Sequence, residues 1–166
     1  MQKYLGVVMD SIESLNYQKD TSLALLLAAQ ENGYLLFYMQ QKDLFIDNNG
    51  PQGKMTPLTV FQDPDKWYAL EKTSIKPLSD LNVILMRKDP PFDSEFIYST
   101  YILEAAERRG TLIVNKPQSL RDCNEKVFAT EFPQCTPPLL VSRDEVLLKQ
   151  FLAEHNEVVY KPLDGM

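Results

Sequence analysis

Residues 4–39, YLGVVMDSIESLNYQKDTSLALLLAAQENGYLLFYM, decide the fold of this chain. The stretch opens with a near-continuous apolar run at 4–9, which is typical of a strand covered on both faces. Asp20 is a candidate N-cap for a helix rich in Leu and Ala that extends to about Asn32, and Gly33 is placed to end it. A second apolar run follows at 35–39. Strand, helix and strand in this order predict a right-handed parallel crossover.

The same alternation resumes further along the chain. Residues 82–86 (NVILM) predict a third buried strand, and residues 111–115 predict a fourth. Between them, Asp93 or Ser94 is expected to cap a helix that continues to about Arg109. We therefore expect an α/β fold over residues 1–122, with a Rossmann-like parallel sheet and helices on both of its faces.

Residues 42–75 depart from this alternation. The segment Asp47-Asn48-Asn49-Gly50 is a strong turn signal, and apolar and polar residues alternate before it and again over 55–61. This pattern predicts a hairpin or flap inserted into the α/β unit.

A change of composition marks the C-terminal part, where prolines stand at 133, 137 and 138. We expect a second domain over residues 123–166. Ser119 and Asp122 resemble a capping box, which predicts a helix through about Thr130. The apolar pattern beyond the prolines predicts a strand at 139–142, a helix at 143–155 and a strand at 158–161.

The composition narrows the class of protein. Acidic side chains number 23 against 17 basic ones, and the basic residues are scattered, which argues against a nucleic-acid partner. The strongly apolar run at 23–29 is far shorter than the ~20 residues of a membrane span, so no membrane partner is expected. An apolar, strand-like run begins at Tyr4, so we expect no signal peptide, and two cysteines in neither a metal nor a redox spacing suggest a reducing cytoplasm.

Polar side chains follow three of the expected strands, at the edge where open parallel sheets bind ligands. These segments are Asp10-Ser11, Arg87-Lys88-Asp89 and Asn115-Lys116. Loop ends are polar in any protein, so for each segment alone the two interpretations, ligand binding and simple solvation, are equally balanced. Arg87 is the strongest candidate, because a guanidinium on a stiff double-proline loop can bind a carboxylate through two parallel hydrogen bonds.

Lysines supply the other candidates. Lys161 ends an apolar run and precedes a Pro-Leu-Asp-Gly turn, a placement suited to a nucleotide phosphate. The spacing of Lys126 by itself favours a solvated helix face. No Gly-x-Gly-x-x-Gly follows the first strand, so a dinucleotide site is not supported.

Two long runs carry a family resemblance, VILMRKDPPFDSEFIY (83–98) and GTLIVNKPQSLRDCNEK (110–126). Together with GVVMD (6–10) and KPLDGM (161–166), in the same order, they strongly resemble the prokaryotic-type glutathione synthetases over the whole chain. The resemblance implies an ATP-grasp ligase that joins γ-glutamylcysteine to glycine through an acyl phosphate, with magnesium bridging the phosphates of ATP. It also implies a homo-oligomer, and a fold in which a pre-ATP-grasp domain is followed by the start of an α+β ATP-grasp lid.

Site residues are implied in the same way. The resemblance makes Lys126 and Lys161 contacts of the ATP phosphates, with Asp164, Gly165 and Met166 beside them. It makes Arg87 a substrate-binding or site-shaping arginine. With the strand-end candidates Asp10, Ser11, Lys88 and Asp89, Arg87 makes up the expected dipeptide-binding set.

The chain also departs from the family pattern. The family continues past Asp-Gly-Met with a glycine-rich loop over the phosphates, and its magnesium carboxylates come later still. We therefore expect these 166 residues alone to be inactive, as the N-terminal part of such a ligase. The alternative is a non-catalytic α/β binding or subunit-interaction module that shares the pre-ATP-grasp fold.

Overall fold

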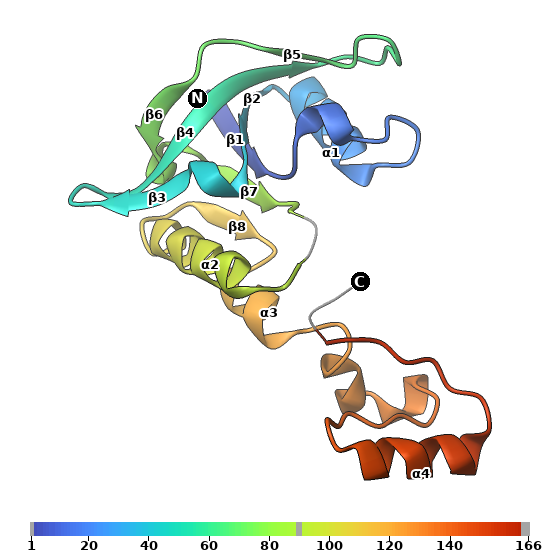
Figure 1. The fold of residues 1–166 in the computed structure, drawn as a ribbon. Coiled ribbons are helices and arrows are strands. Elements are labelled where there is room, and N and C mark those ends of the chain that lie inside the picture. Colours follow the sequence, from blue (N-terminus) through green and yellow to red (C-terminus); the bar gives the residue numbers. More distant parts are fainter. Residues whose placement is uncertain (1, 89–90, 164–166) are drawn as a thin grey trace.

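The computed structural model describes residues 2–88 and 91–163, and it shows an α/β sheet followed by a C-terminal segment of short helices and loops (Figure 1). The parallel strands are β1 (Lys3–Val8), β2 (Tyr34–Met39), β7 (Val83–Met86) and β8 (Leu112–Val114). In the described residues the main strand order is β3-β4-β2-β1-β7-β8. β1 lies in the middle and pairs in parallel with β2 on one side and with β7 on the other. This topology confirms the predicted α/β class and the parallel crossover.

Helices cover both faces of this sheet, as predicted. Helix α1 (Thr21–Glu31) buries Leu26 in an apolar cluster that also contains Val7 of β1. Helix α2 (Ser94–Glu107) buries Leu103 in a second cluster with Val8, the next residue of the same strand. Successive strand residues point to opposite faces, so the two clusters lie on the two sides of the sheet. Burying each such Leu stabilises the fold by about 1.5–3 kcal/mol.

Hydrogen bonds to capping side chains and the backbone conformation of glycine explain where these helices begin and end. The side chain of Asp20 accepts a hydrogen bond from the backbone N–H of Ser22 at 2.7 Å, and that of Asp93 accepts one from Phe96 N–H at 2.9 Å. Gly110 has a φ of +101° just after α2, in the region that favours glycine. These caps hold the helix starts near the carboxyl ends of the strands.

The predicted hairpin is confirmed, but it is not a separate flap. Strands β3 (Leu44–Asp47) and β4 (Gly50–Val60) pair across the expected turn. β4 then pairs antiparallel with β2, so this segment extends the main sheet. The short strands β5 (Tyr68–Leu70) and β6 (Ser74–Pro77) pair with β4 in turn.

The helix predicted over 119–130 is wrong in its bounds. Helix α3 runs from Pro117 to Asp122, and Lys116 is its N-cap. Proline is preorganised for the first helical position, which moves the start ahead of Ser119. The side chain of Asn124 accepts hydrogen bonds from Lys126 N–H and Val127 N–H, and this turn replaces the expected continuation of the helix.

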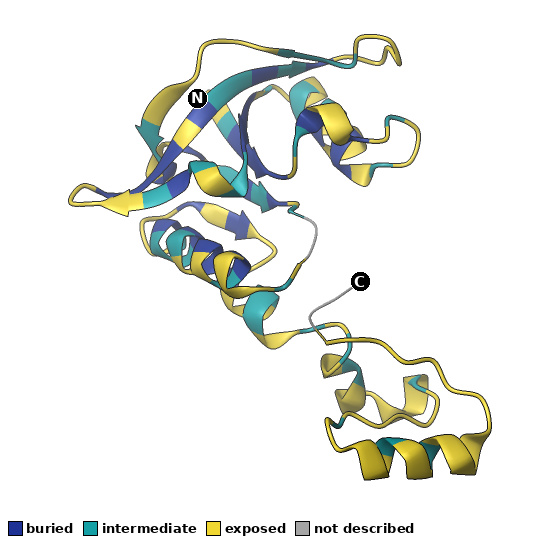
Figure 2. Ribbon diagram, viewed as in Figure 1, coloured by how far each residue is buried: buried dark blue, intermediate teal, exposed yellow. Residues whose placement is uncertain are grey.

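The strands predicted at 139–142 and 158–161 are also wrong: within the described part of the C-terminal segment, neither range is in a strand. A strand needs a neighbour to pair with, and residues 123–163 form short 3₁₀ turns and helix α4 (Glu145–His155) instead. The predicted helix at 143–155 is confirmed, with its start two residues later because Asp144 is the N-cap. Figure 2 shows this segment largely exposed.

No helix in residues 2–88 or 91–163 has the length and apolar character needed to cross a membrane.

Candidate functional site

The carboxyl ends of β1 and β7 flank a reversal in the strand order. From β1 the chain crosses through α1 to β2 on one side, and it later returns as β7 on the other side of β1. Ligands of open α/β sheets bind in the crevice outside such a reversal. Asp10 follows β1 and Arg87-Lys88 follow β7, and the backbone N–H of Arg87 donates to Val8 C=O at 2.7 Å. Side chains from both strand ends therefore meet in this crevice.

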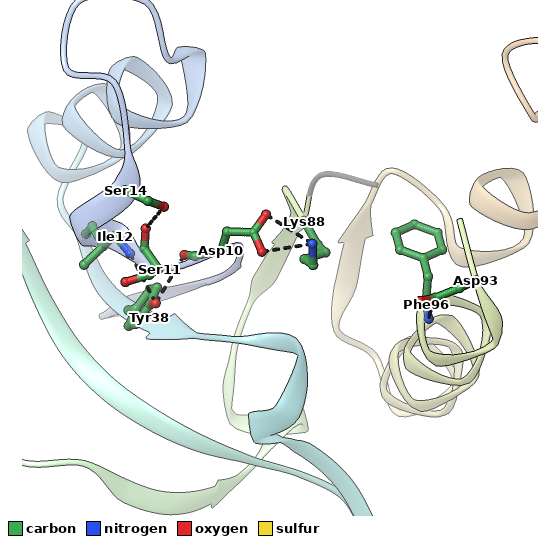
Figure 3. A network of polar contacts seen from close by, with 8 residues as sticks. All are labelled: Asp10, Ser11, Ile12, Ser14, Tyr38, Lys88, Asp93 and Phe96. Carbon is green, nitrogen blue, oxygen red and sulfur yellow. Dashed lines mark hydrogen bonds and ion pairs between the residues drawn. The ribbon is translucent and has the colours of Figure 1, made fainter. Parts of the chain in front are cut away.

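Asp10 and Lys88 form an ion pair across the crevice (Figure 3). The Lys88 ammonium lies 2.9 Å from Oδ1 and 3.2 Å from Oδ2 of Asp10. The Lys88 side chain is only 16% exposed, whereas that of Asp10 is 48% exposed. The pair thus joins a largely buried cation to a carboxylate that solvent and ligands can reach.

Tyr38 fixes the loop that carries Asp10 and Ser11. Its phenol donates a hydrogen bond to the Asp10 carbonyl at 3.2 Å and accepts one from Ile12 N–H at 3.3 Å. Burial raises the pKa of Tyr38, so the phenol stays neutral and keeps its donor. Ser14 Oγ adds a hydrogen bond to the Ser11 carbonyl at 2.7 Å. The loop after β1 is therefore held from Asp10 to Ile12.

Arg87 points away from its neighbour Lys88. Its guanidinium donates to Thr21 Oγ1 at 2.9 Å and to Ser22 Oγ at 3.2 Å, at the start of α1. The structure places Arg87 beside the helix that follows β1, and it does not line the cleft described next.

A cleft of about 500 Å³ opens beside the crevice. Its lining combines apolar side chains from the start of α2 and from α3 with polar and basic side chains. Three lysines lie around it: Lys88 after β7, Lys116 after β8 and Lys126 after α3. The remaining lining residues are Pro91, Phe92, Phe96, Asn115, Ser119, Leu120, Cys123, Asn124, Glu125 and Leu163. Lys88 thus belongs to both the crevice and the cleft.

Lys126 and Lys161 act on one carboxylate at the edge of this cleft. Lys126 Nζ lies 2.7 Å from Glu125 Oε1; the Lys126 side chain is 16% exposed and that of Glu125 is 71% exposed. The hydrogen bond from Lys126 is the largest cause that lowers the pKa of Glu125, and the charges of Lys126 and Lys161 lower it further. Lys126 therefore contacts this exposed anion directly, and the charge of Lys161 acts on the same carboxylate.

Not every candidate from the sequence can be placed, and some lining residues were missed. Asp89, Asp164, Gly165 and Met166 lie outside the described residues. Glu125 was missed because a carboxylate beside a lysine resembles any solvated pair. Lys116 was noted only as a polar strand end. Across residues 2–88 and 91–163, no group of three or more His, Cys, Asp or Glu side chains is placed to hold a metal ion.

Comparisons with known proteins agree with the resemblance seen in the sequence. The model of the N-terminal domain of prokaryotic glutathione synthetase matches residues 4–121, and that of its ATP-grasp domain matches residues 125–166. A glutathione synthetase of Pseudomonas aeruginosa is 60% identical over 166 residues, which are 100% of this chain and 52% of that protein. One of Escherichia coli is 56% identical over 162 residues, 98% of this chain and 51% of that protein.

This chain spans about half the length of the curated relatives it matches. The N-terminal family model alone matches well over half of the chain, and the identity extends through the strand ends that form the crevice and the cleft. The resemblance predicted from the sequence is confirmed, and the chain belongs to the prokaryotic glutathione synthetase family.

Proposed function

We propose that the full-length protein uses ATP to join γ-glutamylcysteine to glycine and forms glutathione, ADP and phosphate. In this reaction ATP converts the cysteinyl carboxylate to an acyl phosphate, and the glycine amine then displaces the phosphate. The proposal is supported by family membership and by relatives that are named glutathione synthetases.

One observation in the structure carries the proposal: the Lys126 ammonium contacts an exposed carboxylate at the edge of the cleft, and the charge of Lys161 lowers the pKa of the same carboxylate. Ammonium groups bind phosphate oxygens through charge-assisted hydrogen bonds. A polyphosphate carries far more charge than the Glu125 carboxylate and can replace it as their partner. The donor set therefore fits the phosphate end of ATP. Asp164, Gly165 and Met166 are proposed to lie beside it.

The dipeptide is proposed to bind on the crevice side, near Asp10, Ser11 and Lys88. Arg87 belongs to this proposed set although its guanidinium contacts two hydroxyls, because neutral acceptors leave its charge available to a carboxylate. Asp89 completes the set from outside the described residues. The cleft then runs from the dipeptide toward the phosphates.

The wider features of the enzyme are proposed on the family alone. They are a cytoplasmic location, a homo-oligomer, a pre-ATP-grasp domain at 1–122 and the beginning of an ATP-grasp domain at 123–166. Magnesium is proposed as a cofactor, but the described residues hold no fitting ligand cluster, so we assign none of them to it and derive no step through it.

A coupled assay on the full-length protein tests the function. Phosphate release from ATP should require both γ-glutamylcysteine and glycine, and mass spectrometry should find glutathione. Release that needs the dipeptide but not glycine would point to another ATP-grasp reaction. Binding of the dipeptide with no phosphate release in any mixture would instead favour a non-catalytic binding module.

A further inference from the structure

The Asp10–Lys88 pair combines three properties that a purely structural ion pair does not need. It lies at the reversal of strand order, where this sheet type binds ligands. Its carboxylate is half exposed while its ammonium is largely buried. Its lysine also lines the cleft that contains Lys126. A ligand that extends from the cleft past Lys88 would thus reach Asp10, whose carboxylate lies 2.9 Å from the same ammonium.

We infer that Asp10 and Lys88 bind the zwitterionic head of the dipeptide, Asp10 taking the α-ammonium and Lys88 the α-carboxylate of the glutamyl residue. This inference rests on the proposed function, since it concerns the same substrate. In the free protein each group serves as the partner of the other. On binding they exchange partners, and each charge keeps an opposite charge beside it.

Partner exchange makes the site selective for a head that carries both charges. A head that lacks the ammonium gives Asp10 no cation in exchange for Lys88, and a head that lacks the carboxylate gives Lys88 no anion in exchange for Asp10. Sites built to pair a polar substrate group discriminate strongly against analogues that lack the group, because the protein group is left unpaired. The pair therefore selects for a γ-linked residue that carries both an α-ammonium and an α-carboxylate.

The same geometry sets the direction of the substrate. Lys88 faces Asp10 on one side and the cleft on the other, and Lys126 lies at the edge of that cleft. A dipeptide with its glutamyl head at Asp10 extends its cysteinyl carboxylate toward the lysines proposed to hold the phosphates. This is the end that the proposed reaction phosphorylates.

Two analogues test the inference in the full-length protein: glutarylcysteine, which lacks the α-ammonium, and γ-aminobutyrylcysteine, which lacks the α-carboxylate. The unmodified protein should use each with kcat/KM at least about 10-fold below that of γ-glutamylcysteine. Asp10→Asn should lower kcat/KM for γ-glutamylcysteine at least about 10-fold, and for glutarylcysteine by less than about twofold. Lys88→Gln should show the same selectivity toward γ-aminobutyrylcysteine.

A matched control is Glu145→Gln, which removes the carboxylate of an exposed ion pair with Lys149 on α4 and should change none of these ratios. Melting temperatures identify any variant that fails to fold, and the analogue series on the unmodified protein does not depend on the variants. Equal losses on all three dipeptides would assign the pair a structural role and overturn the inference. So would full activity with either analogue. Failure to ligate any dipeptide would instead refute the proposed function itself.

Discussion

Replacing Lys126 with Ala should weaken ATP binding while leaving the fold intact. In the free protein this lysine pairs with Glu125 at 2.7 Å, but that carboxylate is 71% exposed, so the pair stabilises the protein by only about 0–1 kcal/mol. A charge-assisted hydrogen bond from the ammonium to a phosphate contributes about 1.5–3 kcal/mol. The difference leaves a net loss of about 0.5–3 kcal/mol, or about 2–150-fold in the Kd for ATP.

The measurement is calorimetric titration of the full-length protein with ATP. Lys149→Ala is the matched control, because Lys149 also pairs with a glutamate, Glu145, at 2.6 Å but lies on α4 outside the cleft. We expect the control to change the Kd by less than about twofold. Equal Kd values for the two variants would refute the reasoning and remove Lys126 from the proposed phosphate site.

Glu125→Gln gives the complementary test. It removes the carboxylate that competes with the phosphates for Lys126, so ATP should bind more tightly than to the unmodified protein. The hydrogen bond from Lys126 holds the pKa of Glu125 below its ordinary value, so the charged pair persists at neutral pH and is lost only as the pH falls through that lowered pKa. Weaker ATP binding by Glu125→Gln at neutral pH would contradict this competition.

Four further outcomes are expected. The 166-residue chain alone should release no phosphate that depends on both γ-glutamylcysteine and glycine; such release would show that this half suffices. Lys161→Ala in the full-length protein should raise the KM for ATP more than the KM for glycine, in steady-state kinetics. Arg87→Lys should melt normally yet lose at least about 10-fold in kcat/KM for the dipeptide, and an unchanged value would withdraw Arg87 from the site. Gly50→Ala should lower the free energy of unfolding in urea by about 2–3 kcal/mol, because the φ of Gly50 is +106° and a Cβ there would displace the Arg109 guanidinium. Gly33→Ala should lower it by only about 1 kcal/mol, because there is open space around Gly33. Similar losses for the two variants would contradict this reasoning.

The first crossover could be predicted because its signals are local. The apolar run of β1, the Asp20 cap and the positive φ of Gly33 each depend on a few neighbouring residues. The two strands expected near the C-terminus failed for the opposite reason. The apolar run that contains Val159 looks like a strand, but in the structure this side chain is 84% exposed and the described segment around it offers no strand to pair with.

Predictions of the site also depended on whether the signal was local or came from contacts between distant residues. Strand-end positions identified Asp10 and Lys88 as candidates, but the two residues are 78 positions apart, so the sequence alone could not show that they form an ion pair. The hydroxyl partners of Arg87 likewise lie 65 and 66 residues away. The sequence can show which groups reach the edge of a sheet. Which of them meet depends on strand order and on the direction each side chain takes.

Strand β4 has a consequence for how the chain folds. It pairs with β3 across a short turn and with β6 over a loop of modest length. The pairing of β1 with β7 instead joins segments that are much further apart in the chain. Hairpins form in about 1–10 μs, and pairings between distant segments are slower because they must first close a long loop. We expect residues 44–77 to fold early, so that β4 is already formed when β2 pairs with it. The segment that interrupts the sequence pattern would then be a starting point for the sheet, and the edge that carries Asp10 and Lys88 would be among the last parts to assemble.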